Sequence, residues 1–331
     1  MKKIINRILK VIGIVIAVIL FICVLFFIYH RVTCIDEEKN HPSQFSFVEV
    51  GGKRISMQIQ GEGEHTIVLL PGLGTTSPIY DFAPLADELA KNNRVITYEP
   101  FGYGYSDITD KSRTIENECE ELKQALDASG VEGPYIFMAH SVYGLDSIYF
   151  ANKYPEYVEA VVGIDCTMPA MLSYFGEEVP ADMPMAMDLM RITGLTRLLQ
   201  MMDENQFVSD NSSNLYSEEN LQEQRIISAR IEANKNVIEQ YNDLDNKIKA
   251  TFDLKYTDSM PILFFTTNDA DKEQRDDGKT SKSLYETYIT NPDIQSVITY
   301  DASHYMHWTK AKEMSDDVND FVKEVFNDRN K

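Results

Sequence analysis

Cysteine and positive charge are both scarce in this sequence. The 331 residues include 4 cysteines, and their spacing matches neither a metal site nor a dense disulfide framework, which leaves only a lone Cys34–Cys166 bridge open. Lysine and arginine number 31 against 52 acidic residues, for a net charge of -21. A surface this acidic repels phosphate, so the composition excludes nucleic acid as a partner. The absence of an internal period excludes repeat arrays.

Charge is missing altogether from residues 11–29, which are apolar over the length of a membrane-spanning helix. A cleaved signal peptide is disfavoured because bulky residues stand where a cleavage site needs small ones. Residues 1–10 carry four cations and no acid, which predicts a cytoplasmic N-terminus. We therefore expect a single-pass protein of the cell membrane, with residues 30–44 as a tether and the acidic body outside the cytoplasm.

From residue 45 onward, strand-like and helix-like stretches alternate. The expected strands are FSFVEV, RISMQIQ, TIVLL, RVITYE, YIFMA, AVVGI, ILFFTT and QSVITY. A hairpin followed by alternating strands and helices predicts an α/β fold with a mostly parallel central sheet and helices on both faces. The methionine-rich stretch 168–258 has helical patterns and no clear strand. We expect it to be a helical insertion that divides the core into residues 45–167 and 259–331.

A serine follows one of the central strands. Ser141 comes after YIFMA and His140 and just before a predicted helix, where a sharp turn exposes a nucleophilic hydroxyl; the alternative is an ordinary helix N-cap. The glycine-rich loop LLPGLG follows another apolar strand. Its Leu73 N–H, together with the Val142 N–H, is well placed to stabilise an oxyanion. These residues predict acyl transfer.

A general base is expected in the loop after the last strand. His304 lies nearer the end of QSVITY than His307 does and is the favoured base, whereas His140 is a poor one because it neighbours the nucleophile. The catalytic acid is predicted to be Asp165, at the end of AVVGI. Asp269 and Asp271, which follow ILFFTT, remain alternatives, because either strand end could present a carboxylate to the histidine.

The order PGLG, EPFGYGYSD, AHSVYG, GIDCTMP and DASHYMH resembles the α/β-hydrolase superfamily from residue 45 onward. It is most similar to membrane-anchored α/β hydrolases of Firmicutes. That resemblance implies a helical cap for residues 168–258 and fits an acid at Asp165. Two positions depart from the pattern: Pro71 replaces a histidine, and Tyr143 replaces a small residue beside the nucleophile.

The nucleophile narrows the expected reaction. Dehalogenases and epoxide hydrolases of this superfamily use an aspartate there, whereas position 141 is serine. A serine with a histidine base predicts cleavage of an ester or thioester in a small-molecule acyl substrate, through an acyl-enzyme and without a metal or organic cofactor. Two alternatives stay open. One is an aminopeptidase or amidase of the proline-iminopeptidase type, with Glu177 and Glu178 as candidate amine ligands. The other is a non-catalytic binding protein of the same fold.

Overall fold

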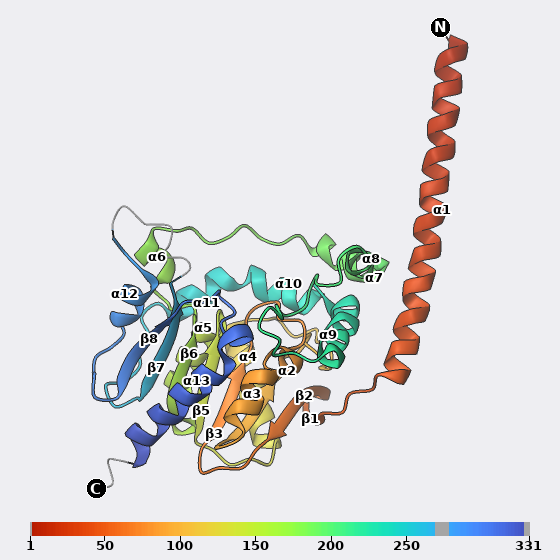
Figure 1. The fold of residues 1–331 in the computed structure, drawn as a ribbon. Coiled ribbons are helices and arrows are strands. Elements are labelled where there is room, and N and C mark those ends of the chain that lie inside the picture. Colours follow the sequence, from red (N-terminus) through yellow and green to blue (C-terminus); the bar gives the residue numbers. More distant parts are fainter. Residues whose placement is uncertain (1, 269–277, 328–331) are drawn as a thin grey trace.

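A computed structural model describes residues 2–268 and 278–327 and contains an eight-stranded sheet in the order β1-β2-β4-β3-β5-β6-β7-β8 (Figure 1). The strands are β1 (Ser46–Val50), β2 (Lys53–Gln60), β3 (Thr66–Leu70), β4 (Arg94–Tyr98), β5 (Tyr135–His140), β6 (Val158–Ile164), β7 (Ile262–Thr267) and β8 (Gln295–Tyr300). Strand β2 pairs antiparallel with β1 and β4, and all other neighbours are parallel. The predicted mostly parallel sheet is therefore confirmed.

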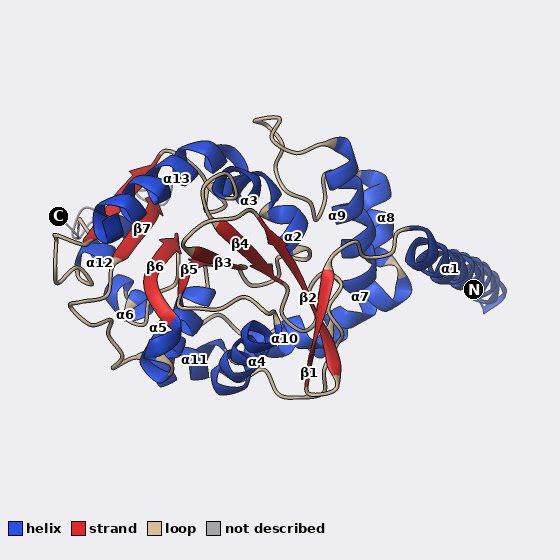
Figure 2. Ribbon diagram, turned by 90° about the horizontal axis from the view of Figure 1, so that it is seen from below, coloured by secondary structure: helices blue, strands red, loops and turns tan. Residues whose placement is uncertain are grey.

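Helices cover both faces of this sheet (Figure 2). The core helices and helical turns are α2 (Pro78–Asp81), α3 (Ala83–Leu89), α4 (Ile115–Ala128), α5 (Tyr143–Lys153), η1 (Pro155–Tyr157), α12 (Ser281–Glu286), α13 (His307–Val322) and η4 (Lys323–Asn327). Successive strand residues point to opposite faces. Phe137 on β5 thus joins the cluster under α4 and α5, whereas Met138 joins the one under α3 and α13. Both faces are buried, which explains why the central strands are apolar throughout.

The segment between β6 and β7 is helical and covers the carboxyl ends of the strands (Figure 1). It contains α6 (Met171–Phe175), η2 (Met185–Met187), α7 (Asp188–Thr193), α8 (Leu195–Met202), α9 (Glu218–Ile231), α10 (Lys235–Asn242) and α11 (Leu244–Thr251). We call this segment the cap. It brings Glu232, just after α9, over the loop that follows β3, and Asn236 and Gln240 of α10 over the loop that follows β4.

The N-terminal helix α1 (Lys2–Asn40) extends away from the body (Figure 1). It contains an 18-residue window of mean hydropathy 3.5, none of which is buried inside the protein. Residues 30–40, which were expected to belong to the tether, continue the same helix. His30 and Glu37 at this end are buried against the cap. The body is therefore attached to the apolar helix through a docked helical segment.

Candidate active site

Ser141 sits in a strained turn between β5 and α5. Its φ of 53° lies in the left-handed region, which costs a non-glycine residue on the order of 1–3 kcal/mol. Main-chain hydrogen bonds hold this conformation: the Ser141 N–H donates to the Ile164 carbonyl at 3.1 Å, and the Ser141 carbonyl accepts from the Thr167 N–H at 2.8 Å. The turn therefore fixes the serine at the carboxyl end of the central strand.

Gly144 provides the small residue that this turn needs. A Cβ on Gly144 would lie 2.6 Å from the Thr167 carbonyl oxygen and 2.7 Å from the Cys166 Cβ. Tyr143 is buried in a different direction, with its hydroxyl 3.5 Å from the Nε2 of Gln240 in the cap. The large side chain of Tyr143 therefore fits beside Ser141, because the position that packs closely against Cys166 and Thr167 is that of Gly144.

His304 and Asp165 meet at the same edge of the sheet. The Nδ1 of His304 lies 2.6 Å from the Oδ2 of Asp165. Asp165 follows β6 with a φ of 39°, and its N–H donates to the Phe265 carbonyl at 2.8 Å. An Nδ1–H donated to the carboxylate leaves Nε2 of the histidine free to accept a proton.

The loop that carries His304 is held by two buried groups. The Nε2–H of His140 donates to the main-chain carbonyl of His304 at 3.2 Å, and the Thr267 hydroxyl at the end of β7 donates to the Ala302 carbonyl. Burial, reinforced by the nearby His307 and His304, lowers the pKa of His140 well below its usual value. His140 therefore stays neutral, and its geometry suits a residue that positions the His304 loop.

His307, the alternative base, is engaged elsewhere. It is fully buried at the start of α13, and its Nε2 lies 2.7 Å from the Oδ2 of Asp81. Asp81 also accepts hydrogen bonds from the Trp308 indole at 2.7 Å and from the cap hydroxyl of Ser209 at 2.9 Å. Sequence reasoning missed Asp81, because the four-residue helix α2 is too short to carry a periodic pattern.

The loop after β3 lies directly against Ser141. A Cβ on Gly72 would lie 3.2 Å from the Ser141 Cβ and 2.7 Å from the His140 Nδ1, so only glycine fits there. In the described part of the chain, the Leu73 and Val142 amides have no acceptor within the protein. They are available for an oxyanion. The next amide, of Gly74, already donates to the Tyr103 hydroxyl at 3.1 Å.

Tyr103 links this loop to the cap. Its hydroxyl donates to the Oε1 of Gln240, whose Nε2 donates to Glu118 at 2.9 Å. Lys247 of the cap is completely buried between Glu118 and Asp146, with its Nζ 2.9 Å from the Oδ1 of Asp146. These contacts make a continuous polar network from the Gly74 amide to α4 and α5. Sequence reasoning missed it, because its members are far apart in the chain.

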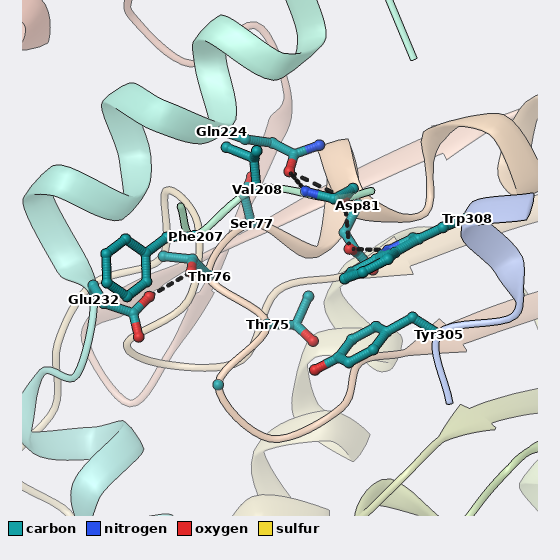
Figure 3. A pocket seen from close by; sticks show the side chains of 12 residues that line it. Thr75, Thr76, Ser77, Asp81, Phe207, Val208, Gln224, Glu232, Tyr305 and Trp308 are labelled. Atoms are coloured by element: carbon teal, nitrogen blue, oxygen red, sulfur yellow. Dashed lines mark hydrogen bonds between the residues drawn. The ribbon is translucent and has the colours of Figure 1, made fainter. Parts of the chain in front are cut away.

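A cavity of about 150 Å³ lies between the loop after β3 and the cap (Figure 3). Its lining is Gly74, Thr75, Thr76, Ser77, Asp81, Phe207, Val208, Ser209, Gln224, Glu232, Tyr305 and Trp308. Tyr305 and Trp308 stack with ring centroids 4.1 Å apart. The Thr76 hydroxyl donates to the Oε2 of Glu232 at 2.7 Å. Because Tyr305 follows His304 and Gly74 follows Leu73, the cavity adjoins the predicted catalytic groups.

Glu232 is a second acidic group of this cavity, besides Asp81, that sequence reasoning did not find. Burial raises the pKa of its carboxyl group, and the Thr76 hydrogen bond lowers it in part. The acids proposed from sequence as amine ligands, Glu177 and Glu178, are exposed and do not line the cavity. The alternative catalytic acids Asp269 and Asp271 lie outside the described residues. Cys34 and Cys166 are free thiols, so the lone bridge left open by the sequence does not form.

Comparison with known proteins agrees with this architecture. A family described as alpha/beta hydrolase fold matches residues 65–311. Protein YbdG of Bacillus subtilis is 32% identical over 164 residues, which are 49% of this chain and 50% of YbdG. Serine hydrolase BPHL of Mus musculus is 33% identical over 118 residues, covering 35% of this chain and 40% of BPHL. The chain thus spans about half the length, or less, of these two relatives.

The solved structures show the same fold. The Cif epoxide hydrolase from Acinetobacter nosocomialis superimposes with a TM-score of 0.66 at 16% identity, covering 89% of this chain and 96% of that one. At this identity the likeness concerns the fold alone. Since the family match covers most of the chain, the protein belongs to the alpha/beta hydrolase fold family. The predicted membership of the α/β-hydrolase superfamily is therefore confirmed.

Proposed function

We propose that the protein is a membrane-anchored serine hydrolase that cleaves an ester or thioester through an acyl-enzyme. The observation that carries this proposal is the 2.6 Å contact between His304 and Asp165, at the strand ends where Ser141 also lies. The Ser141 Oγ attacks the acyl carbon while His304 Nε2 takes its proton, and the Leu73 and Val142 amides stabilise the oxyanion. His304 then protonates the departing alcohol or thiol. Water, deprotonated by His304, releases the acid. No cofactor is required.

The nucleophile distinguishes this reaction from that of the epoxide hydrolases that share the fold. In this superfamily those enzymes use an aspartate at the turn, and this chain has Ser141. A serine alkoxide attacks acyl carbons well, whereas opening an epoxide with serine would leave a stable ether. A serine with a histidine base and two available amides also favours an enzyme over a purely binding role.

An amine-directed aminopeptidase or amidase of the proline-iminopeptidase type is the second candidate, and Glu232 favours it. Its partly buried carboxylate faces a small cavity with two stacked aromatic rings. Among the residues that the structure describes, no cation offsets the burial that raises the pKa of Glu232. A substrate ammonium group would supply the missing charge. Phe207 and Ala233, which lie in or beside this cavity, have φ values of 63° and 49°, as expected where strain serves a binding site.

The apolar helix supports the membrane part of the proposal. Residues 11–29 span about the thickness of a bilayer core, and the preceding cations favour a cytoplasmic N-terminus. The body would then lie on the outer surface of the cell membrane. Protease added to intact protoplasts should remove the catalytic domain while leaving a membrane-bound fragment. A fully protected domain would contradict this orientation.

Labelling with a fluorophosphonate probe tests the proposed chemistry. The wild-type protein should be labelled on Ser141 and should hydrolyse p-nitrophenyl esters. Ser141→Ala should lose both properties while keeping its fold. The matched control is Ser173→Ala, because Ser173 is an exposed cap serine whose hydroxyl hydrogen-bonds to the Ala170 carbonyl. Labelling that persists in Ser141→Ala, or that is lost equally in Ser173→Ala, would overturn the assignment.

A further inference from the structure

The cap presents an apolar surface beside the N-terminal helix. Large apolar side chains of α7 and α8 are exposed, up to 77% for Met202. We call these residues the cap face: Leu189, Ile192, Leu195, Leu198, Met201 and Met202. Residues 189–202 contain no aspartate or glutamate, although the chain has 52 acidic residues. A cluster of this kind on an otherwise acidic body marks an interaction surface.

Helices α7 and α8, which carry the cap face, lie beside α1 (Figures 1 and 2). A groove of about 710 Å³ separates the cap face from α1, and it is lined by Leu20, Ile22, Cys23, Val24, Phe26, Phe27, Thr193, Leu195 and Leu198. The apolar run ends at Tyr29, and a helix rises about 1.5 Å per residue. Measured along the helix axis from Tyr29 towards the N-terminus, Phe27 therefore lies at about 3 Å and Leu20 at about 14 Å. Half of a bilayer core is about 15 Å thick. Leu195 and Leu198 thus lie level with residues that would occupy the outer leaflet.

An ion pair just beyond the apolar run fixes this alignment. The guanidinium of Arg197 on α8 contacts both carboxylate oxygens of Glu37 on α1, at 2.7 and 2.6 Å. Burial and the Arg197 charge lower the pKa of His30, whose neutral Nδ1 accepts from the Arg197 Nε at 3.3 Å. A Cβ on Gly194 would lie 2.7 Å from the His30 Cβ. Close packing and a partly buried bidentate pair hold α8 against α1.

We propose that the cap face is inserted in the outer leaflet of the membrane, with phospholipid acyl chains filling the groove between α8 and α1. This inference rests on the proposed membrane anchoring and extends it: the catalytic domain is seated in the bilayer surface. Acyl chains are the occupant that this arrangement favours, because the groove continues the surface of a helix already long and apolar enough to span the bilayer. The acidic body would be repelled by anionic headgroups, so the attachment has to be apolar.

Quenching of tryptophan fluorescence by brominated phospholipids tests the proposal in the full-length protein reconstituted into liposomes. The wild-type protein has one tryptophan, Trp308, which gives the baseline. Leu198→Trp adds a probe on the cap face, and Val18→Trp adds one within the apolar run. Phe252→Trp is the matched control, because Phe252 is an exposed apolar residue of the cap beyond α11. Fluorophosphonate labelling verifies that each variant is folded.

We expect Val18→Trp and Leu198→Trp each to lose at least half of their added emission, and Phe252→Trp to stay at the baseline. Quenching of Val18→Trp without quenching of Leu198→Trp would overturn the seating of the cap while leaving the anchor intact. If neither probe is quenched, the anchor itself is wrong. A blue-shifted but unquenched Leu198→Trp would mean that protein, such as a second copy of the chain, covers the cap face, which also overturns the proposal.

Discussion

The Oδ2 of Asp165 lies 2.6 Å from the Nδ1 of His304, across the carboxyl edge of the sheet. Two backbone features make this contact possible. Asp165 turns away from β6 with a positive φ of 39°, and the His304 loop is tied down by His140 and Thr267. The carboxylate can therefore orient the imidazole and stabilise its protonated form.

Asp165→Asn should lower kcat on the order of 10⁴-fold, because the histidine would lose both its orientation and its charged partner. Steady-state ester hydrolysis measures the loss. The comparison variants Asp269→Asn and Asp271→Asn should each remain within about tenfold of wild type. If Asp165→Asn is active and either Asp269→Asn or Asp271→Asn is inactive, the catalytic acid has to be assigned to the loop after β7.

Tyr103→Phe should lower kcat by about tenfold with little change in KM. The phenol oxygen accepts from the Gly74 amide and donates to Gln240, so its removal loosens the loop that carries the Leu73 amide, at a cost of about one hydrogen bond. The matched control is Tyr105→Phe, whose hydroxyl contacts Glu223 at 3.3 Å and not the loop after β3. Equal effects of the two substitutions on kcat would show that Tyr103 does not act through this loop.

Glu99 is a fully buried residue directly after β4. Its ionisation should lower the free energy of unfolding as the pH rises from about 4.5 to about 7. Burial raises the pKa of this carboxyl group from 4.5 to about 7, against the lowering effect of amide and hydroxyl donors. The folded state then binds the proton more tightly than the unfolded state, so stability is highest below the unfolded pKa and falls as the pH passes through the folded value. At about 1.4 kcal/mol per pKa unit, the loss is on the order of 3 kcal/mol.

Urea unfolding of the wild-type protein and Glu99→Gln at pH 4.5, 6 and 7.5 measures this effect. The variant cannot ionise at residue 99, so the difference in its free energy of unfolding between the lowest and highest pH should be about 3 kcal/mol smaller than in wild type. Identical pH dependence in both proteins would refute the linkage to Glu99.

Glu232→Gln separates the two candidate reactions. If the cavity binds a substrate ammonium group, wild type should prefer aminoacyl esters over their N-acetylated analogues. The substitution should then reduce kcat/KM for the amine substrates by about 10- to 100-fold, the loss expected for a charged hydrogen bond. Glu178→Gln serves as the exposed acidic control. Unchanged selectivity in Glu232→Gln would remove the amine-directed alternative and favour simple esters.

Much of the core could be predicted because its signals are local. The apolar central strands are buried on both faces, and α4 and α13 present apolar residues at helical spacing. Ser141, Asp165 and His304 could be nominated because each follows a strand, and parallel strands end at one edge. The structure brings Asp165 and His304 together there and places Ser141 at the end of the neighbouring strand β5.

The missed features depend on contacts between distant segments. Asp81, Gln240 and Glu232 carry no local pattern, and each meets its partners only when the cap closes over the core. The alignment of α8 with α1 likewise depends on Arg197 reaching Glu37, 160 positions away. Periodicity describes which face of a helix is apolar but not which surface that face meets.

Trapping of the acyl-enzyme is the most direct measurement of the central claim. The wild-type protein is mixed with an activated ester, and the reaction is quenched in acid within milliseconds. The protein is then digested, and the masses of its peptides are measured by mass spectrometry. We expect a transient acyl adduct on the peptide that contains Ser141, which accumulates when deacylation is slowed, and no adduct in Ser141→Ala. Turnover of the ester without any adduct on Ser141, or an adduct that persists in Ser141→Ala, would contradict it.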